Sequence, residues 1–322
     1  MRAIKNSFDN FLTVRPALQA IAYSVGGWTA QLKRGDTPGS LSHPEGKVLF
    51  ILGAGRSGNT LLRRLLIERS QIFIPPETYA LTGIAATLLR NKHMNWSAQV
   101  DLALGALEFQ PEFVTFGVAS FSDFAIAAKQ WDFRRRRAGT LVVELYRWLA
   151  VQRAVQTEWV GDKTPMNTLR LGLIDLLFPV ARYVFIQRDP YDVVMSYIKS
   201  GIYSDPMKAA DRWILSKRAW VAFRRGASAT AALEVRYEDL VRCPDQVVAR
   251  IMSAFGIPAR EQWLDAARLL GDVTLREHHH RVLGDVSAAS IGQGRTDLPA
   301  NLRRLLARKL NSEAIDSGYM PI

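Results

Sequence analysis

The stretch from Gly53 to Thr60 has the residue types and the spacing that bind phosphate. It reads Gly-Ala-Gly-Arg-Ser-Gly-Asn-Thr, which is the pattern G-x-x-x-x-G-x-T. Loop amides and the N-terminus of a following helix donate hydrogen bonds to an anion. Arg56 adds a fixed positive charge, and Ser57 and Asn59 add polar side chains. We therefore expect this loop to bind a phosphate-bearing ligand.

Asn59 stands where nucleoside triphosphatases with this loop carry a lysine. In those enzymes the lysine reaches the β- and γ-phosphates, so triphosphate hydrolysis without it lacks its main cation. The substitution favours another phosphate-bearing ligand. A P-loop kinase or triphosphatase remains the alternative within the enzyme class.

Three short apolar runs predict the strands that position such a loop. They cover Lys47–Leu52, Arg182–Gln187 and Ala232–Tyr237, and each is followed by a polar turn and a helical pattern. Continuous apolar runs are typical of strands buried on both faces of a parallel sheet. We predict an α/β fold with a P-loop-like parallel sheet flanked by helices. Asp189-Pro190 marks the start of one of these helices.

The domain organisation expected from the pattern is simple. Residues 1–46 form a weakly patterned N-terminal leader, and residues 47–322 form a single domain. Within it, residues 78–158 are expected to form a mostly helical insertion. This insertion would cap the acceptor side of the site, where a second substrate binds next to the phosphate-bearing ligand. Most of its aromatic side chains are expected in the core, and the basic run Arg134–Arg137 either contacts the acceptor or a membrane, or is a solvated surface.

Composition narrows the class of protein. The chain has 322 residues, 48% of them apolar, with a net charge of +12, and Cys243 is its one cysteine. A single cysteine excludes an intrachain disulfide and favours a reducing compartment. We expect a cytoplasmic protein without a signal peptide or spanning helix. The positive charge fits an anionic ligand, and a nucleic-acid or membrane-surface protein is the alternative of another class.

Four segments together resemble the sulfotransferases that use 3′-phosphoadenosine 5′-phosphosulfate (PAPS) as sulfuryl donor. The phosphate loop is similar to their motif G-x-x-R-S-G-(T/N)-T-L-L, and the segment 182–197 is similar to their second motif, with an arginine and a serine eight positions later. Residues 159–165 resemble the G-D-K-T-P element of bacterial members, and residues 235–240 resemble a Y-E-D-L strand end. The C-terminal segment 290–295 departs from the usual I-G-x-W-(K/R), because Gly294 replaces an aromatic residue.

The resemblance implies which side chains bind the nucleotide. The first motif would hold the 5′-phosphosulfate, and the pair in the second motif would hold the 3′-phosphate. The implied binding residues for PAPS and its product PAP are Arg56, Ser57, Gly58, Asn59, Thr60, Arg188, Ser196, Tyr237 and Arg295.

The resemblance also implies the catalytic residues. Glu77 is similar to the catalytic glutamate of the carbohydrate and tyrosylprotein branches, and none of the histidines occupies the position of a histidine base. Pro75 and Pro76 hold Glu77 on an extended loop. We expect Glu77 to act as the base, with Lys163 and Arg56 as the cations for the leaving oxygen and the sulfonate.

No metal is expected to take part. The trio His278–His280 invites a metal site, but adjacent residues of one segment rarely converge on one ion, so a solvated loop is favoured. The resemblance thus implies transfer of a sulfuryl group from PAPS to an acceptor hydroxyl on a carbohydrate or glycolipid. A phenol, a tyrosyl peptide and a small natural product remain alternative acceptors. No nucleic-acid partner is expected, a peripheral contact at the inner membrane face stays open, and the pattern predicts no oligomeric state.

Overall fold

The computed structural model describes residues 47–322 except residue 92, residues 227–230 and residues 275–281. The described residues belong to one compact unit that spans residues 43–322. The expected leader, residues 1–46, and the histidine trio 278–280 lie outside the described residues. The division of the chain at residue 46 therefore stays a prediction.

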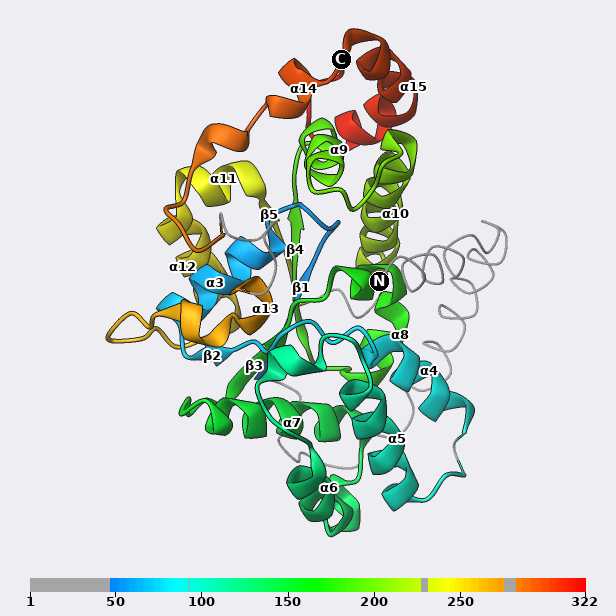
Figure 1. Ribbon diagram of the computed structural model, residues 1–322, viewed down its shortest axis with the longest axis vertical. Helices are drawn as coiled ribbons and strands as arrows, with labels where there is room; N and C mark the ends of the chain where they lie inside the picture. The colour runs from blue at the N-terminus through cyan, green and yellow to red at the C-terminus, as the bar shows by residue number, and fades with distance from the viewer. Residues whose placement is uncertain (1–46, 92, 227–230, 275–281) are drawn as a thin grey trace. The chain divides into compact units, whose positions relative to one another are not determined.

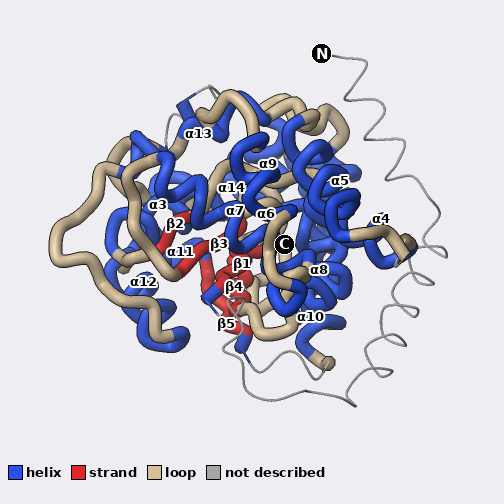
Figure 2. Tube along the Cα trace, turned by 90° about the horizontal axis from the view of Figure 1, so that it is seen from below, coloured by secondary structure: helices blue, strands red, loops and turns tan. Residues whose placement is uncertain are grey.

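Five parallel strands form one sheet in the order β2-β3-β1-β4-β5. The strands are β1 (Val48–Leu52), β2 (Ile72–Phe73), β3 (Trp159–Asp162), β4 (Arg182–Gln187) and β5 (Ala232–Arg236). Every residue of β1 is buried, as expected for the central strand of a sheet covered on both faces. In Figure 2 the strands run between α3, α11 and α12 on one side and α8 and α10 on the other. The predicted α/β fold is confirmed.

Helices make up most of the remaining described chain. They are α3 (Asn59–Arg69), α4 (Leu81–Arg90), α5 (Trp96–Glu108), α6 (Ser122–Lys129), α7 (Ala138–Gln152), α8 (Leu171–Leu177), α9 (Pro190–Lys199), α10 (Pro206–Arg224), α11 (Tyr237–Arg242), α12 (Pro244–Phe255), α13 (Gly271–Thr274), α14 (Gln293–Asp297) and α15 (Ala300–Asp316). Figure 1 shows α9, α10 and α15 grouped near the C-terminal end of the chain. No helix in the described ranges is both long enough and apolar enough to cross a membrane.

Two of the five strands carry no local signal that predicts them. The three predicted strands are present, although β5 ends at Arg236 because Tyr237 already begins α11. Strand β2 has only two residues, and β3 has four, one of which is Asp162. Such short strands lack the apolar run that identifies a buried strand. They are stabilised by pairing with neighbouring strands, because β3 pairs with β1 and β2 pairs with β3.

The block between β2 and β3 is helical, as predicted. It contains α4 to α7, which lie together in the lower part of Figure 1. Phe116, Phe121 and Phe124 are buried, and the Phe121 ring meets the Phe116 ring edge-on at 5.9 Å. Because edge-to-face aromatic contacts stabilise a packed interior, these rings act as core. Phe109 and Phe133 are exposed.

Gly294 in α14 has no space for a side chain. A Cβ atom built there would lie 2.1 Å from the carbonyl carbon of Tyr191 and 2.4 Å from the amide nitrogen of Asp192. This backbone belongs to α9, against which α14 packs. The close approach of the two backbones explains why Gly294 replaces the aromatic residue common in the related motif.

A buried ion pair ties α3 to the short helix α13. Arg63 Nη1 lies 2.7 Å from one Asp272 carboxylate oxygen and 2.8 Å from the other. Arg63 also donates to the carbonyl oxygens of Ile74 and Leu269. Burial by itself would raise the pKa of Asp272, but the positive charges of Arg63 and Lys163 lower it to about 2. The carboxylate is therefore ionised throughout the physiological range.

Asp272 should make the free energy of unfolding depend on pH in the acid range. Its pKa of about 2 in the folded chain lies below the usual unfolded value of about 3.9. The resulting stabilisation, about 2 to 3 kcal/mol, is therefore complete above the unfolded pKa and is lost as the pH falls from about 4 to about 2. The free energy of unfolding of the wild type, measured with urea, should be lower at about pH 3 than at about pH 6 by roughly half of this stabilisation.

The matched variant is Asp272→Asn, which cannot titrate at this position. It should unfold more easily at neutral pH, because Arg63 keeps a buried charge without its carboxylate. Its stability should also fall less steeply with acid than that of the wild type. Parallel pH profiles for the two proteins would contradict this account.

Candidate functional site

Most of the predicted site residues lie at or directly after the carboxyl ends of the five parallel strands. Strand β1 leads into the loop 53–58, β2 leads to Glu77, β3 to Lys163, β4 to Arg188 and β5 to Tyr237. Carboxyl ends of parallel strands meet at one edge of the sheet, which is where ligands bind in α/β folds. Read in the order of the strands, the phosphate loop lies between the Glu77 and Lys163 side and the Arg188 and Tyr237 side.

The phosphate loop leads directly into α3. Gly58 precedes the helix with φ +97°, and a Cβ atom there would lie 2.5 Å from the ring of Tyr237. Arg56 adopts φ +66°, a left-handed conformation that is uncommon for a residue with a side chain. Asn59 Nδ2 donates to the carbonyl oxygen of Ala54 at 2.8 Å, so this amide closes the loop on itself. Asn59 therefore replaces the usual lysine with a structural hydrogen bond.

Two buried donors, one in the loop and one on Arg188, have no hydrogen-bond partner among the described residues. Within the described residues, neither the Ser57 hydroxyl nor Arg188 Nε has a hydrogen-bond partner. Buried polar groups are nearly always paired, and an unpaired one calls for an explanation. Both lie on residues predicted to bind the nucleotide phosphates. The residues present therefore fit a phosphate-bearing ligand.

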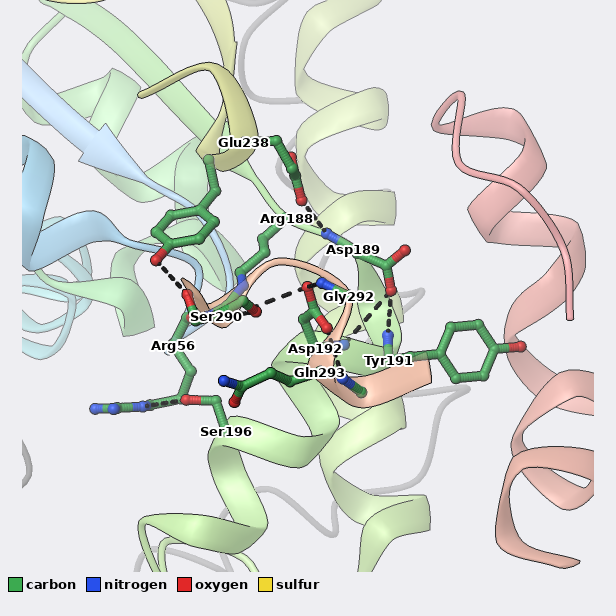
Figure 3. A network of polar contacts seen from close by, with 12 residues as sticks. Arg56, Arg188, Asp189, Tyr191, Asp192, Ser196, Glu238, Ser290, Gly292 and Gln293 are labelled. Atoms are coloured by element: carbon green, nitrogen blue, oxygen red, sulfur yellow. Dashed lines mark hydrogen bonds and ion pairs between the residues drawn. The ribbon is translucent and has the colours of Figure 1, made fainter. Parts of the chain in front are cut away.

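Arg188 and Ser196 both contact Arg56. Arg188 contacts its backbone, and Ser196 contacts its side chain. Arg188 donates to the carbonyl oxygen of Arg56 at 3.2 Å and to that of Ser290 at 2.8 Å. Arg56 Nε donates to Ser196 Oγ at 3.1 Å. The guanidinium of Arg188 also lies 4.3 Å from the ring centre of Tyr237, whose hydroxyl is 2.7 Å from Ser290 Oγ. Figure 3 shows Arg56, Arg188, Ser196 and Ser290 close together.

The start of α9 is held by three carboxylates. Asp189 caps the helix by accepting from the backbone of Tyr191, and Pro190 is the first helical residue. Asp192 accepts from the amides of Gly292 and Gly294 at 2.8 and 2.7 Å, and Glu238 accepts from the Asp189 amide. All three acids thus accept hydrogen bonds from backbone amides at or near the start of α9 (Figure 3). Burial raises the pKa of Asp192, which the two backbone hydrogen bonds oppose.

Glu77 and Lys163 form a buried ion pair. Lys163 Nζ contacts Glu77 Oε1 directly and lies 3.9 Å from Asp272. Gln110, from the helical insertion, donates to the Glu77 carbonyl oxygen at 3.2 Å. The structure thus brings the predicted base and the predicted cation together, although 86 residues separate them in the chain. A carboxylate and an ammonium in contact can accept one proton and stabilise one developing negative charge.

A second network supports the Lys163 segment. Asp162, just before Lys163, accepts hydrogen bonds from Tyr146 at 2.8 Å, from Asn167 at 2.8 Å and from the Thr78 hydroxyl. Burial raises the pKa of Asp162 above its usual value, and these hydrogen bonds oppose the rise without cancelling it. The network joins α7, the loop after β2 and the loop after β3. It therefore fixes the backbone on both sides of the ion pair.

The sequence analysis did not single out several residues that the structure places at the site. Arg63 looks like an ordinary helix residue, and Asp272 lies in a segment without a motif. Ser290 falls inside the noted C-terminal segment, but its carbonyl contact with Arg188 depends on the folded chain. The signal that could have been used for Arg63 is its position on the helix directly after the phosphate loop.

Other predicted residues have contacts elsewhere. Arg295 donates to Asp189 at 2.7 Å and to the carbonyl oxygens of Met320 and Pro321, so its role at the nucleotide stays a prediction. In the basic run, Arg135 lies over the Trp131 ring and 3.6 Å from Glu144. Among the described residues, no group of three His, Cys, Asp or Glu side chains could hold a metal ion.

One curated protein is similar to this chain in sequence. The nodulation protein NoeE of Sinorhizobium fredii is 23% identical over 237 residues, which cover 65% of this chain and 50% of NoeE. The chain thus spans about half the length of that curated relative.

Two solved structures share the fold. The sulfotransferase domain of the Synechococcus PCC 7002 olefin synthase has a TM-score of 0.54 and 22% identity, covering 82% of this chain and 93% of that domain. The sulfotransferase domain from the curacin biosynthetic pathway has a TM-score of 0.55 and 19% identity, covering 85% and 98%.

The family comparison is the most specific. The model of the sulfotransferase family matches residues 49–261, well over half of the chain and all five strands of the sheet. The matched range includes the phosphate loop, Glu77, Lys163, Arg188 and Tyr237. This chain belongs to the sulfotransferase family.

Proposed function

We propose that this chain transfers the sulfuryl group of PAPS to an acceptor hydroxyl. One observation carries the proposal: a single sheet edge holds a phosphate loop between a buried glutamate–lysine pair and a buried arginine. A donor with two phosphate groups needs two anion sites, and an acceptor hydroxyl needs a nearby base. The order of the strands places the two anion sites and the base next to one another at this edge.

The nucleotide is proposed to bind across the phosphate loop towards Arg188. The loop amides, Ser57 and Thr60 would face the 5′-phosphosulfate, because the N-terminus of α3 favours negative charge. Arg188 and Ser196 would hold the 3′-phosphate, with the guanidinium of Arg188 packed over the Tyr237 ring. The unpartnered donors on Ser57 and Arg188 support this placement.

Glu77 is proposed to be the general base. As the acceptor oxygen attacks sulfur, its O–H bond breaks and the proton passes to the Glu77 carboxylate. A new oxygen–sulfur bond forms, the bond from sulfur to the phosphate oxygen breaks, and PAP leaves with the bonding electrons. Lys163 and Arg56 would stabilise the negative charge on that oxygen. Proton uptake neutralises Glu77, so the charge of Lys163 becomes available as the leaving oxygen becomes negative.

The acceptor is proposed to be a hydroxyl of a carbohydrate or a glycolipid. The support is the glutamate base with the G-D-K-T-P element, which resembles sulfotransferases of sugars, and the helical insertion that connects β2 to β3 beside the ion pair. Mass spectrometry of glycans and lipids from cells with and without the protein should show an added sulfate on a sugar. Sulfate on a phenol, a tyrosyl peptide or a small natural product instead would replace this acceptor class.

Arg188→Ala should weaken the binding of PAP. Loss of a charge-assisted hydrogen bond to phosphate should cost about 1.5 to 3 kcal/mol of binding free energy. Calorimetry without magnesium measures this affinity directly, and a triphosphatase would not bind PAP tightly under these conditions. The control is Arg218→Ala, which removes an exposed arginine of α10. Equal affinity of wild type and Arg188→Ala would remove Arg188 from the nucleotide site.

Glu77→Gln should lower turnover and leave PAP affinity unchanged. A positioned base contributes roughly 10²- to 10⁴-fold to the rate, so kcat should fall by that factor. Lys163→Ala should also lower kcat, and it should weaken the binding of PAPS because a cation near the sulfonate is lost. The control is Glu261→Gln, at an exposed position. Near-normal turnover of Glu77→Gln would assign the base to another residue.

A further inference from the structure

Asp272 reaches the reaction centre from a part of the chain that the family match does not cover. The match ends at residue 261, and Asp272 lies in α13 (Gly271–Thr274). One of its carboxylate oxygens is 3.9 Å from Lys163 Nζ. Its two oxygens accept from Arg63 at 2.7 and 2.8 Å. A C-terminal segment thus supplies a carboxylate next to the proposed catalytic lysine.

The four charged groups at this place balance one another. Arg63, Lys163, Asp272 and Glu77 are 0%, 1%, 6% and 9% exposed, and they comprise two cations and two carboxylates. A buried charge is unfavourable unless an opposite charge or hydrogen bonds compensate it. The cluster is therefore neutral as long as Glu77 is ionised.

Proton transfer to Glu77 disturbs this balance. The Lys163 ammonium then loses its closest carboxylate, and a flexible lysine side chain without a partner can turn away. Asp272 is the other carboxylate within 4.0 Å of this ammonium among the residues described. Arg63 holds Asp272 in place, because it is itself anchored to the carbonyl oxygen of Ile74, three residues before Glu77, and to that of Leu269.

We propose that Asp272 is a positioning residue that retains the Lys163 ammonium at the reaction centre while Glu77 carries the acceptor proton. The inference rests on the proposed function, in which Glu77 is the base and Lys163 stabilises the leaving oxygen. Asp272 touches neither the donor nor the acceptor in this role. It acts through Lys163, and Arg63 fixes its carboxylate.

A crystal structure of Glu77→Gln tests the proposal without any substrate. The glutamine has the shape of a protonated glutamate and no charge. In this variant Lys163 Nζ should close from 3.9 Å to hydrogen-bond distance of Asp272, about 2.7 to 3.2 Å. A Lys163 side chain that has turned away from Asp272 would overturn the inference.

Turnover of Asp272→Asn tests the consequence for catalysis. Because a misplaced catalytic group costs about 10²-fold, kcat per PAP-binding site should fall by roughly that factor, with the Kd for PAP and the acceptor KM unchanged. Counting PAP-binding sites by calorimetry removes any unfolded fraction from the rate. The control is Asp265→Asn, an exposed carboxylate that caps the neighbouring turn. A normal kcat per site in Asp272→Asn would overturn the inference.

Asp272→Glu replaces this variant if Asp272→Asn does not fold. Its longer side chain keeps a negative charge for Arg63 but changes the position of the carboxylate relative to Lys163. A kcat per site lowered about tenfold or more, with PAP binding intact, would support the inference. A kcat equal to that of the wild type would contradict it.

The two failures are distinguishable. If the wild type transfers no sulfuryl group from PAPS, the proposed function fails, and the Glu77→Gln structure still decides whether Asp272 retains Lys163. If Glu77→Gln keeps normal turnover, only the assignment of the base fails. If Glu77→Gln is slow while Asp272→Asn is normal, the inference about Asp272 fails and the proposed function stands.

Discussion

Parallel pairing of five short strands is the constraint on which the site depends. Because the strands run in the same direction, all of their carboxyl ends meet at one edge of the sheet, and each end delivers a polar segment to it. The central strand β1 is fully buried, so its position cannot shift without exposing apolar surface. The phosphate loop, the ion pair and Arg188 are therefore held in a set order by the sheet, although they come from distant parts of the chain.

The two sides of this edge compensate buried positive charge differently. Arg188 is held mainly by carbonyl oxygens and by the Tyr237 ring, with Asp192 at 3.9 Å, so much of its positive potential is left for an anion. Lys163 instead contacts a full carboxylate, Glu77. The first arrangement suits a residue that binds phosphate throughout the reaction. The second suits a residue whose charge is needed only when a proton has moved.

The segment after the family match completes both sides. Ser290 contacts Arg188 and Tyr237, and the amides of Gly292 and Gly294 bind Asp192 at the start of α9. Asp272 extends the charge cluster around Lys163. The C-terminal segment thus closes the sheet edge by backbone groups as much as by side chains. A change there, such as a side chain at residue 294, would act on α9 through direct backbone contact.

Local pattern was sufficient to predict the strands β1, β4 and β5, the helix start at Asp189-Pro190 and the glycine-rich turn from β1 into α3. Apolar runs, capping residues and glycine spacing act over a few neighbouring residues. Local pattern did not predict β2 or β3, which are too short to carry such a run. Only the tertiary structure brought Glu77 against Lys163, placed Asp272 beside them and engaged Arg295 with Asp189. These contacts join residues far apart in the chain, and their energy comes from the burial and pairing of charge, which no local pattern records.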